Sequence, residues 1–263
     1  MPRANRHYIP GYIWHITHRC HKREFLLKFA RDRRRWMAWL FEARKRHGLS
    51  ILNYMVTSNH VHLLVSGDGD RDAIPKSIQL LAGKTGQEYN QRKKRKGAFW
   101  EDRYHATAVE RAGHLARCMI YIDMNMVRAG VVKNPEDWSF CGYNEIQHPP
   151  KRYGLIDTAK AIALLQMRDL EEFQEACKHW IEEALESENH GRESKWTESI
   201  AVGSKGFIEA TKKRLGIRAK GRKVFRNNGA YELREPVAPY KGVFDPENGV
   251  LSLENIYLWR DNL

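Results

Sequence analysis

The stretch LSILNYMVTSNHVHLLVSG, residues 49–67, sets the architecture of the first half of the chain. An apolar run on each side of the polar segment TSN predicts two antiparallel strands joined by a tight turn. The second run carries His60 and His62 around a single valine. Side chains two residues apart in a strand project on one face, about 7 Å apart at their bases, so both imidazoles point the same way.

The pattern around this hairpin alternates between strands and helices. Alternating apolar residues and turn signals predict strands at 11–19, 49–56, 60–67 and 104–110, and helical spacing predicts helices at 30–47, 71–91 and 112–127. The resulting order, β-α-β-β-α-β-α, is typical of an α+β fold of the ferredoxin-like (split βαβ) type. That fold is an antiparallel sheet with helices packed on one face.

A change in composition predicts a second part of the chain. Residues 131–154 hold several Pro, Gly and Asn residues and indicate a boundary. We therefore expect one domain at 1–150 and an extension at 151–263. The extension should be mainly helical, with helical patterns within 157–189 and 203–216.

The charge of the chain is concentrated in its first part. Lysine and arginine number 45 against 32 acidic residues, a net charge of +13. Residues 1–150 hold 26 basic and 14 acidic residues, whereas residues 151–263 hold 19 and 18. Such an excess favours a polyanionic partner, and nucleic acid is the commonest one. The alternative is a basic surface that only keeps the protein soluble.

The compartment follows from what the sequence lacks. No apolar stretch approaches the roughly 20 residues of a membrane helix, and the N-terminus MPRANRHYIPG has no apolar core of a signal peptide. We therefore expect a cytoplasmic protein with no membrane partner. The scattered cysteines form no CxxC pair and suit free thiols in a reducing compartment; they are Cys20, Cys118, Cys141 and Cys177.

Two residues of the helix expected at 112–127 could join the histidine pair. Tyr121 and Asn125 are four apart and share one helix face, which a helix packed across the sheet could bring to the histidines. Two neutral imidazoles and an amide oxygen suit Mg²⁺ or Mn²⁺ better than a closed zinc site. By itself, however, an HxH strand slightly favours structural histidines, and a lone helix tyrosine is usually half-buried against the sheet.

Three motifs in order, SNHVHLLV, FWEDRYH and YIDMNMVRAGVV, resemble the single-tyrosine HUH transposases, and most closely the REP-associated tyrosine transposases. The family's HUH motif, two histidines around a hydrophobic residue, corresponds to residues 60–62. Its nucleophile motif, Tyr-Ile-x-x-Asn-Pro-Val-Arg-Ala-Gly, corresponds to residues 121–130, with Met126 where the family usually has proline. The start YIWHITHRCHKREF is also similar, so the resemblance spans residues 6–145.

The resemblance implies a metal-dependent enzyme that cuts and rejoins single-stranded DNA. In this family the tyrosine, here Tyr121, attacks a phosphodiester and forms a 5′-phosphotyrosine. His60, His62 and Asn125 would then hold a divalent ion, Mg²⁺ or Mn²⁺. The substrate would be single-stranded or hairpin (REP-like) DNA, bound by a monomer or a homodimer. The resemblance leaves the target sequence open, and also whether Tyr121 acts within its own subunit.

Residues that orient the imidazoles are harder to choose. Asn59, directly before the pair, and Asp123, next to the nucleophile motif, could each accept a hydrogen bond from an imidazole. Their ordinary interpretations, a turn residue and a solvated helix side chain, are favoured.

Basic and aromatic residues are the candidates for holding DNA. Phosphate contacts position a nucleic acid without reading its sequence, and aromatic rings stack unpaired bases. The candidates are Arg31, Arg33, Arg34, Arg35, Lys93, Lys94, Arg95, Lys96, Phe99, Trp100, Arg103 and Tyr104, with a basic arm at 218–223. The alternatives are core packing for the aromatic residues and the wet face of an amphipathic helix for the arginines.

Two other function classes share parts of this pattern. A non-catalytic single-stranded nucleic-acid-binding module has the same element order, as in RNA-recognition folds, but gives no reason for the two histidines and the tyrosine together. A replication or conjugation relaxase is also an HUH enzyme. The position of Tyr121 after the histidines and close to Asn125 favours a transposase over a relaxase.

Overall fold

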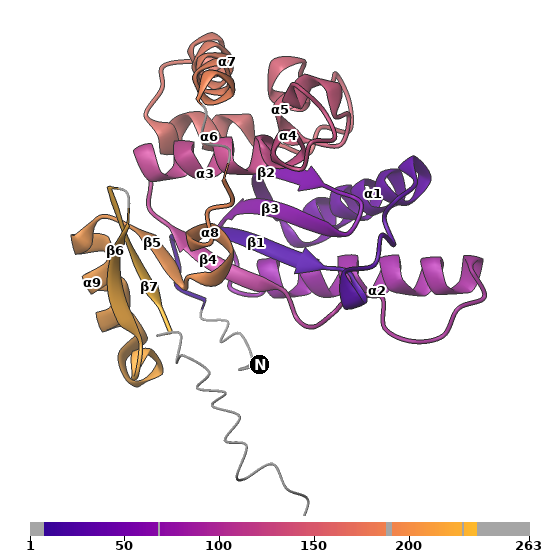
Figure 1. The fold of residues 1–263 in the computed structure, drawn as a ribbon, viewed down its shortest axis with the longest axis horizontal. Helices are drawn as coiled ribbons and strands as arrows, with labels where there is room; N and C mark the ends of the chain where they lie inside the picture. Colours follow the sequence, from indigo (N-terminus) through magenta and orange to yellow (C-terminus); the bar gives the residue numbers. More distant parts are fainter. Residues whose placement is uncertain (1–7, 68, 188–190, 228, 236–263) are drawn as a thin grey trace, which may run out of the picture.

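The computed structural model describes residues 8–67, 69–187, 191–227 and 229–235. Its seven-stranded sheet has the order β2-β3-β1-β4-β5-β7-β6 (Figure 1). The strands are β1 (Ile13–Arg19), β2 (Ser50–Val56), β3 (His60–Ser66), β4 (His105–Val109), β5 (Ala201–Gly203), β6 (Lys223–Asn227) and β7 (Ala230–Arg234).

The helices are distributed over both halves of the chain. In the first half they are α1 (Ala30–His47), α2 (Ala73–Arg92), α3 (Gly113–Asp123), α4 (Asn125–Arg128) and α5 (Gly142–Gln147). In the second half they are α6 (Thr158–Leu165), α7 (Leu170–Glu186), α8 (Lys195–Glu198) and α9 (Lys205–Leu215). Short 3₁₀ turns are η1 (His21–Arg23), η2 (Pro135–Asp137) and η3 (Gly216–Ala219).

Among the described residues, no helix combines the length and the apolar character that crossing a bilayer requires.

The first four strands confirm the ferredoxin-like prediction. Their order, β2-β3-β1-β4, and their uniformly antiparallel pairing are those of the split βαβ fold. The helix α1 connects β1 to β2, α2 connects β3 to β4, and the two helices pack against each other. The single helix expected at 112–127 is divided at Met124 into α3 and α4.

The hairpin β2–β3 is closed by the hydroxyl of Thr57. This hydroxyl donates to the His60 carbonyl at 2.8 Å and accepts from the His60 backbone nitrogen at 3.1 Å. Within the hairpin the register shifts between Ile51 and Asn53, as at a β-bulge. Asn53 is fully buried at this bulge, and its side-chain amide donates to Asp123 of α3.

The sheet carries different elements on its two faces. His15 of β1 faces Tyr121 of α3, at 6.1 Å between ring centroids. His18, three residues along the same strand and so on the other face, stacks on Trp100, whose indole nitrogen donates to the Ala82 carbonyl of α2. The helix α3 therefore lies on the face opposite α2. The histidine pair is on the α3 side of the sheet.

The extension joins the same sheet. It is mainly helical, as expected, but it also contains β5, β6 and β7, which sequence periodicity did not reveal. The strand β5 pairs in parallel with β4 at Ala108 and Val109, and Figure 1 shows the three added strands and α9 gathered at one end of the molecule. The basic segment 218–223 is mostly exposed, although Arg222 is buried and ion-paired with Glu235. Residues 236–263 of the expected extension lie outside the described part.

Packing of α5 against β2 leaves no room for a side chain at Gly142. A Cβ there would overlap Asn53 Oδ1 and lie 3.0 Å from the Tyr54 backbone nitrogen. Gly142→Ala should therefore lower the free energy of unfolding by about 1–3 kcal/mol, the usual cost of overpacking. Urea denaturation followed by circular dichroism measures the change.

The matched control is Gly83→Ala, in the interior of α2, where an added Cβ meets no atom within 4 Å. This change should raise the free energy of unfolding by roughly 0.5–1 kcal/mol, because alanine is the better helix former. Equal stability of the Gly142 variant and the original chain would contradict the close packing of α5 on β2.

Candidate active site

The site begins with the two histidines of β3. Their rings are nearly perpendicular, at 76°, with centroids 4.9 Å apart, so both lie over the same patch of the sheet. Val61 and Leu63, which alternate with them, are buried in the core. His62 is 1% exposed, whereas His60 is half-buried at the end of the strand.

Contacts of His60 fix which of its nitrogens can bind a ligand. Its Nδ1 lies 2.7 Å from Asn59 Oδ1 and 3.0 Å from Thr57 Oγ1. The amide oxygen of Asn59 can only accept, so Nδ1 carries the proton and Nε2 keeps its lone pair. Asn59 is therefore more than the turn residue that its position in the sequence suggested.

His62 lies between two hydrogen-bond partners. Its Nδ1 is 2.9 Å from Nε2 of His15, and its Nε2 is 3.0 Å from the side-chain nitrogen of Asn125. Asn125 thus reaches the histidine pair from α4, as its spacing from Tyr121 suggested. No role for His15 was evident from the sequence. Only the alternation of β1 could have placed its side chain on this face, and its partner on β3 lies far away in the sequence.

Burial keeps these imidazoles neutral. It lowers the pKa of His60 to about 4, with a smaller contribution from Arg19. It lowers the pKa of His62 well below its ordinary value, reinforced by the neighbouring His60. Neutral imidazoles can offer a lone pair to a cation at physiological pH.

Tyr121 lies beside the histidines on α3. Its ring meets that of His62 edge-on, with 5.9 Å between centroids. The guanidinium of Arg128 lies 4.2 Å from the centre of the tyrosine ring and also donates to the Tyr121 carbonyl. Burial raises the pKa of Tyr121, while the charge of Arg128 acts in the opposite direction. The phenol, the two imidazoles and the Asn125 amide therefore meet at one place on the sheet.

Asp123 does not have its expected environment. It is 3% exposed instead of solvated, and both its oxygens accept from the Asn53 amide, at 3.0 and 3.1 Å. Burial raises its pKa to about 7. No described hydrogen bond joins it to a histidine, so Asp123 anchors α3 to the bulged strand β2 instead of orienting an imidazole.

Comparison with known proteins gives one family match. Residues 9–125 match the family model described as "Transposase IS200 like". This part of the chain, less than half of its length, is therefore similar to IS200-like transposases. The match begins just before β1 and ends at Asn125, so it includes both histidines and Tyr121.

Two solved structures are similar to parts of the chain. One is a REP-associated tyrosine transposase bound to a REP hairpin, with 21% identity, a TM-score of 0.47, and coverage of 55% of this chain and 84% of that one. The other is a putative transposase from Deinococcus radiodurans R1, with 16% identity, a TM-score of 0.33, and coverage of 48% and 90%. Comparison with curated proteins gives no match.

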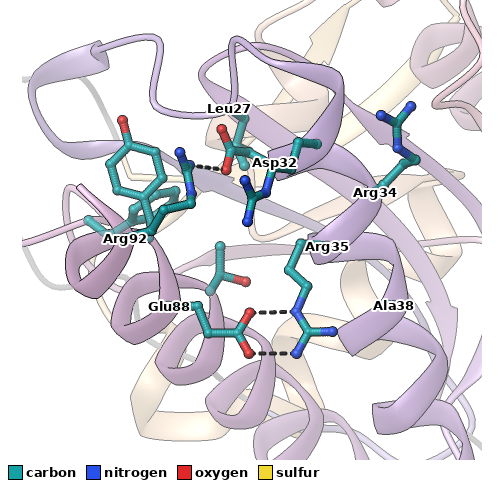
Figure 2. A pocket seen from close by; sticks show the side chains of 11 residues that line it. Leu27, Asp32, Arg34, Arg35, Ala38, Glu88 and Arg92 are labelled. Atoms are coloured by element: carbon teal, nitrogen blue, oxygen red, sulfur yellow. Dashed lines mark hydrogen bonds and ion pairs between the residues drawn. The ribbon is translucent and has the colours of Figure 1, made fainter.

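A groove of about 520 Å³ between α1 and α2 gathers four arginines from the first part of the chain (Figure 2). Two of them are held by acidic residues. Arg35 donates to both oxygens of Glu88, at 2.5 and 2.6 Å, and Arg92 is paired with Asp32. Figure 2 draws both pairs. Arg31 and Arg34 also line the groove and are exposed.

One of the expected phosphate-binding arginines is internal. Arg33 is 8% exposed, and its guanidinium donates to the Leu27 and Lys28 carbonyls at 2.8 and 2.7 Å. It also lies over the rings of Trp138 and Phe140. The expectation that Arg33 contacts DNA phosphates is therefore wrong, because its charge is used inside the protein.

The basic run at residues 93–96 and the nearby Arg103 differ in exposure. Lys93, Lys94, Lys96 and Arg103 are exposed. Arg95 is partly buried and donates to Asn90 Oδ1 and to the Ala98 carbonyl.

Of the aromatic residues near this run, Phe99 and Tyr104 are in the core. Trp100 is half-buried and stacked on His18, at 4.1 Å between ring centroids. A base-stacking role for Trp100 stays a prediction.

Proposed function

We propose that this chain is a single-tyrosine transposase that cuts and joins single-stranded DNA through a 5′-phosphotyrosine on Tyr121. The observation that carries the proposal is the meeting of Tyr121 with His60, His62 and Asn125 on one face of the sheet. A nucleic-acid-binding module does not require a buried phenol beside two neutral imidazoles. The expected substrate is DNA at or near a REP-like hairpin, because the sequence motifs resemble REP-associated tyrosine transposases.

The donor set fits a divalent ion such as Mg²⁺ or Mn²⁺. His60 and His62 each keep a lone pair on Nε2, and the Asn125 amide, whose oxygen can replace its nitrogen by rotation, lies beside His62 Nε2. Among the described residues no group of three or more His, Cys, Asp or Glu could hold a metal, so the set depends on the amide. Three protein donors leave positions for phosphate oxygens, whose developing charge a bound ion would neutralise.

The reaction of the protein's own groups balances without water. The Tyr121 hydroxyl loses its proton as its oxygen forms a bond to phosphorus, the bond from phosphorus to the 3′ oxygen breaks, and that oxygen gains one proton in turn as the 3′-hydroxyl leaves. The new phosphotyrosine is itself a phosphodiester, so another 3′-hydroxyl can reverse the step and join two strands. Arg128, over the tyrosine ring, favours the phenolate that burial disfavours.

DNA positioning falls to the exposed cations on the other side of the sheet. The exposed cations are Arg31 and Arg34 on the groove between α1 and α2, together with Lys93, Lys94, Lys96 and Arg103, and they would contact phosphates. On this proposal residues 1–150 are the catalytic domain, and residues 151–263 are a mainly helical extension of that domain. The protein acts as a monomer or a homodimer in the cytoplasm.

Tyr121→Phe should abolish the covalent adduct that forms when the protein is incubated with Mn²⁺ and a labelled single-stranded hairpin DNA. The variant lacks the attacking oxygen but keeps the ring contacts, so its affinity for DNA should be nearly unchanged. Denaturing electrophoresis detects the adduct, and a filter-binding assay measures affinity.

Tyr104→Phe, a change at another buried tyrosine of the same domain, is the matched control and should form the adduct normally. An adduct with Tyr121→Phe would assign the nucleophile elsewhere. Tight binding with no adduct from the original chain would favour the non-catalytic module.

The double change Arg31→Ala with Arg34→Ala should weaken DNA binding and flatten its salt dependence. Removing one phosphate-binding charge lowers the slope of log affinity against log salt by about 1, so a decrease of up to about 2 is expected. Arg168→Ala, at an exposed arginine of the extension, is the control and should leave the slope unchanged. An unaltered slope in the double variant would exclude the groove as a phosphate-binding surface.

A further inference from the structure

His15 joins the histidine pair to the C-terminal extension. It is fully buried in β1, and its ring is nearly parallel to that of His62, at 8° with centroids 5.1 Å apart. Its Nε2 lies 2.9 Å from His62 Nδ1, and its Nδ1 lies 2.9 Å from the carbonyl oxygen of Trp196. Trp196 belongs to α8, outside the segment 9–125 that matches the transposase family.

The direction of these hydrogen bonds is set by their last member. A carbonyl oxygen can only accept, so Nδ1 of His15 must carry a proton. In a neutral ring Nε2 of His15 is then unprotonated and accepts from Nδ1 of His62. His62 in turn has no proton on Nε2, the nitrogen that faces Asn125 at 3.0 Å. The backbone carbonyl of Trp196 thereby selects, through His15, the tautomer of His62 that can bind a cation.

The carbonyl is itself held firmly against the sheet. Thr107 of β4 donates to it at 3.1 Å and to the Ser199 carbonyl at 2.7 Å. The following residue, Ile200, accepts from the Ala108 backbone nitrogen at 2.8 Å, where β5 begins to pair with β4. The segment 195–199 is therefore attached to the same sheet as the histidines.

We propose that His15 is a positioning residue for His62, and that the segment 195–199 of the extension completes the active site by fixing the proton on His15. This inference rests on the proposed function, because it concerns the presentation of His62 to a divalent ion. It gives the extension a definite task. Without that segment, His15 could adopt either tautomer and His62 could place its proton on Nε2, where it would block a cation.

The direct test is the tautomer of His62 in the full metal-free chain. Long-range ¹H–¹⁵N spectra of histidine-labelled protein, assigned with a His62→Gln variant, distinguish Nδ1–H from Nε2–H. The proposal expects the Nδ1–H form for both His15 and His62. A His62 ring protonated on Nε2 would overturn it, and this readout depends neither on metal binding nor on DNA cleavage.

The second test is the affinity for Mn²⁺, measured by the electron paramagnetic resonance signal of the free ion. His15→Phe keeps the ring but cannot accept from His62, and it should weaken Mn²⁺ binding by about 10–100-fold. His15→Gln, which offers an amide oxygen near the original Nε2, should recover most of that loss. The control is His105→Phe, because His105 also bonds to this segment, at the Ser199 carbonyl, but has no described hydrogen bond to His62.

The outcomes separate the two proposals. Unchanged Mn²⁺ affinity in a folded His15→Phe variant would overturn the role of His15. Failure of the original chain to bind Mn²⁺, with His62 nonetheless in the Nδ1–H form, would instead contradict the proposed metal site. If His15→Phe does not fold, as judged by thermal unfolding without metal, His15→Gln decides: near-original affinity supports the proposal, and a loss as large as that of His62→Gln contradicts it.

Discussion

The pairing register of β1 and β3 fixes the geometry of the whole site. Thr17 lies opposite His62, and Leu64 lies opposite His15, so the two histidines are diagonal neighbours on one face. A slip of one residue would move the histidines of one strand to the face that packs on α2. The burial of both faces holds this register, and the geometry of the candidate site is therefore a consequence of sheet formation.

The remaining parts of the site are attached to this sheet by buried polar contacts. The pair of Asn53 and Asp123 fastens α3, and with it Tyr121, to the bulge in β2. At the other end, the carbonyl of Trp196 accepts from His15 and Thr107, which ties the extension to β1 and β4. Buried polar groups left without partners are costly, so each contact both orders the site and makes the fold specific. Tyr121, the imidazoles and the extension are thus linked into one unit, whereas the arginines of the α1–α2 groove are on a separate surface.

Much of this architecture was predictable from the sequence because it is local. Periodicity and turn residues indicated the hairpin, the helices and the ferredoxin-like order, and a spacing of four brought Tyr121 and Asn125 together. Contacts between distant segments were not predictable. Nothing in the sequence near His15 indicates a carbonyl 181 residues away, and the extension's strands are only three to five residues long. Arg33 and Asp123 carry charges that usually lie in solvent, and only the packed structure reveals that both are internal.

The proposed chemistry requires that His60 and His62 present their Nε2 atoms to a single cation beside Tyr121. Anomalous scattering at the manganese edge, from crystals of the full chain grown with Mn²⁺, locates such a cation without reference to activity. We expect one strong peak bonded to both Nε2 atoms at about 2.0–2.3 Å, on the side of the rings that faces Tyr121. A peak bonded through Nδ1, a peak remote from the histidine pair, or no peak at saturating Mn²⁺ would show that the histidines do not form this site.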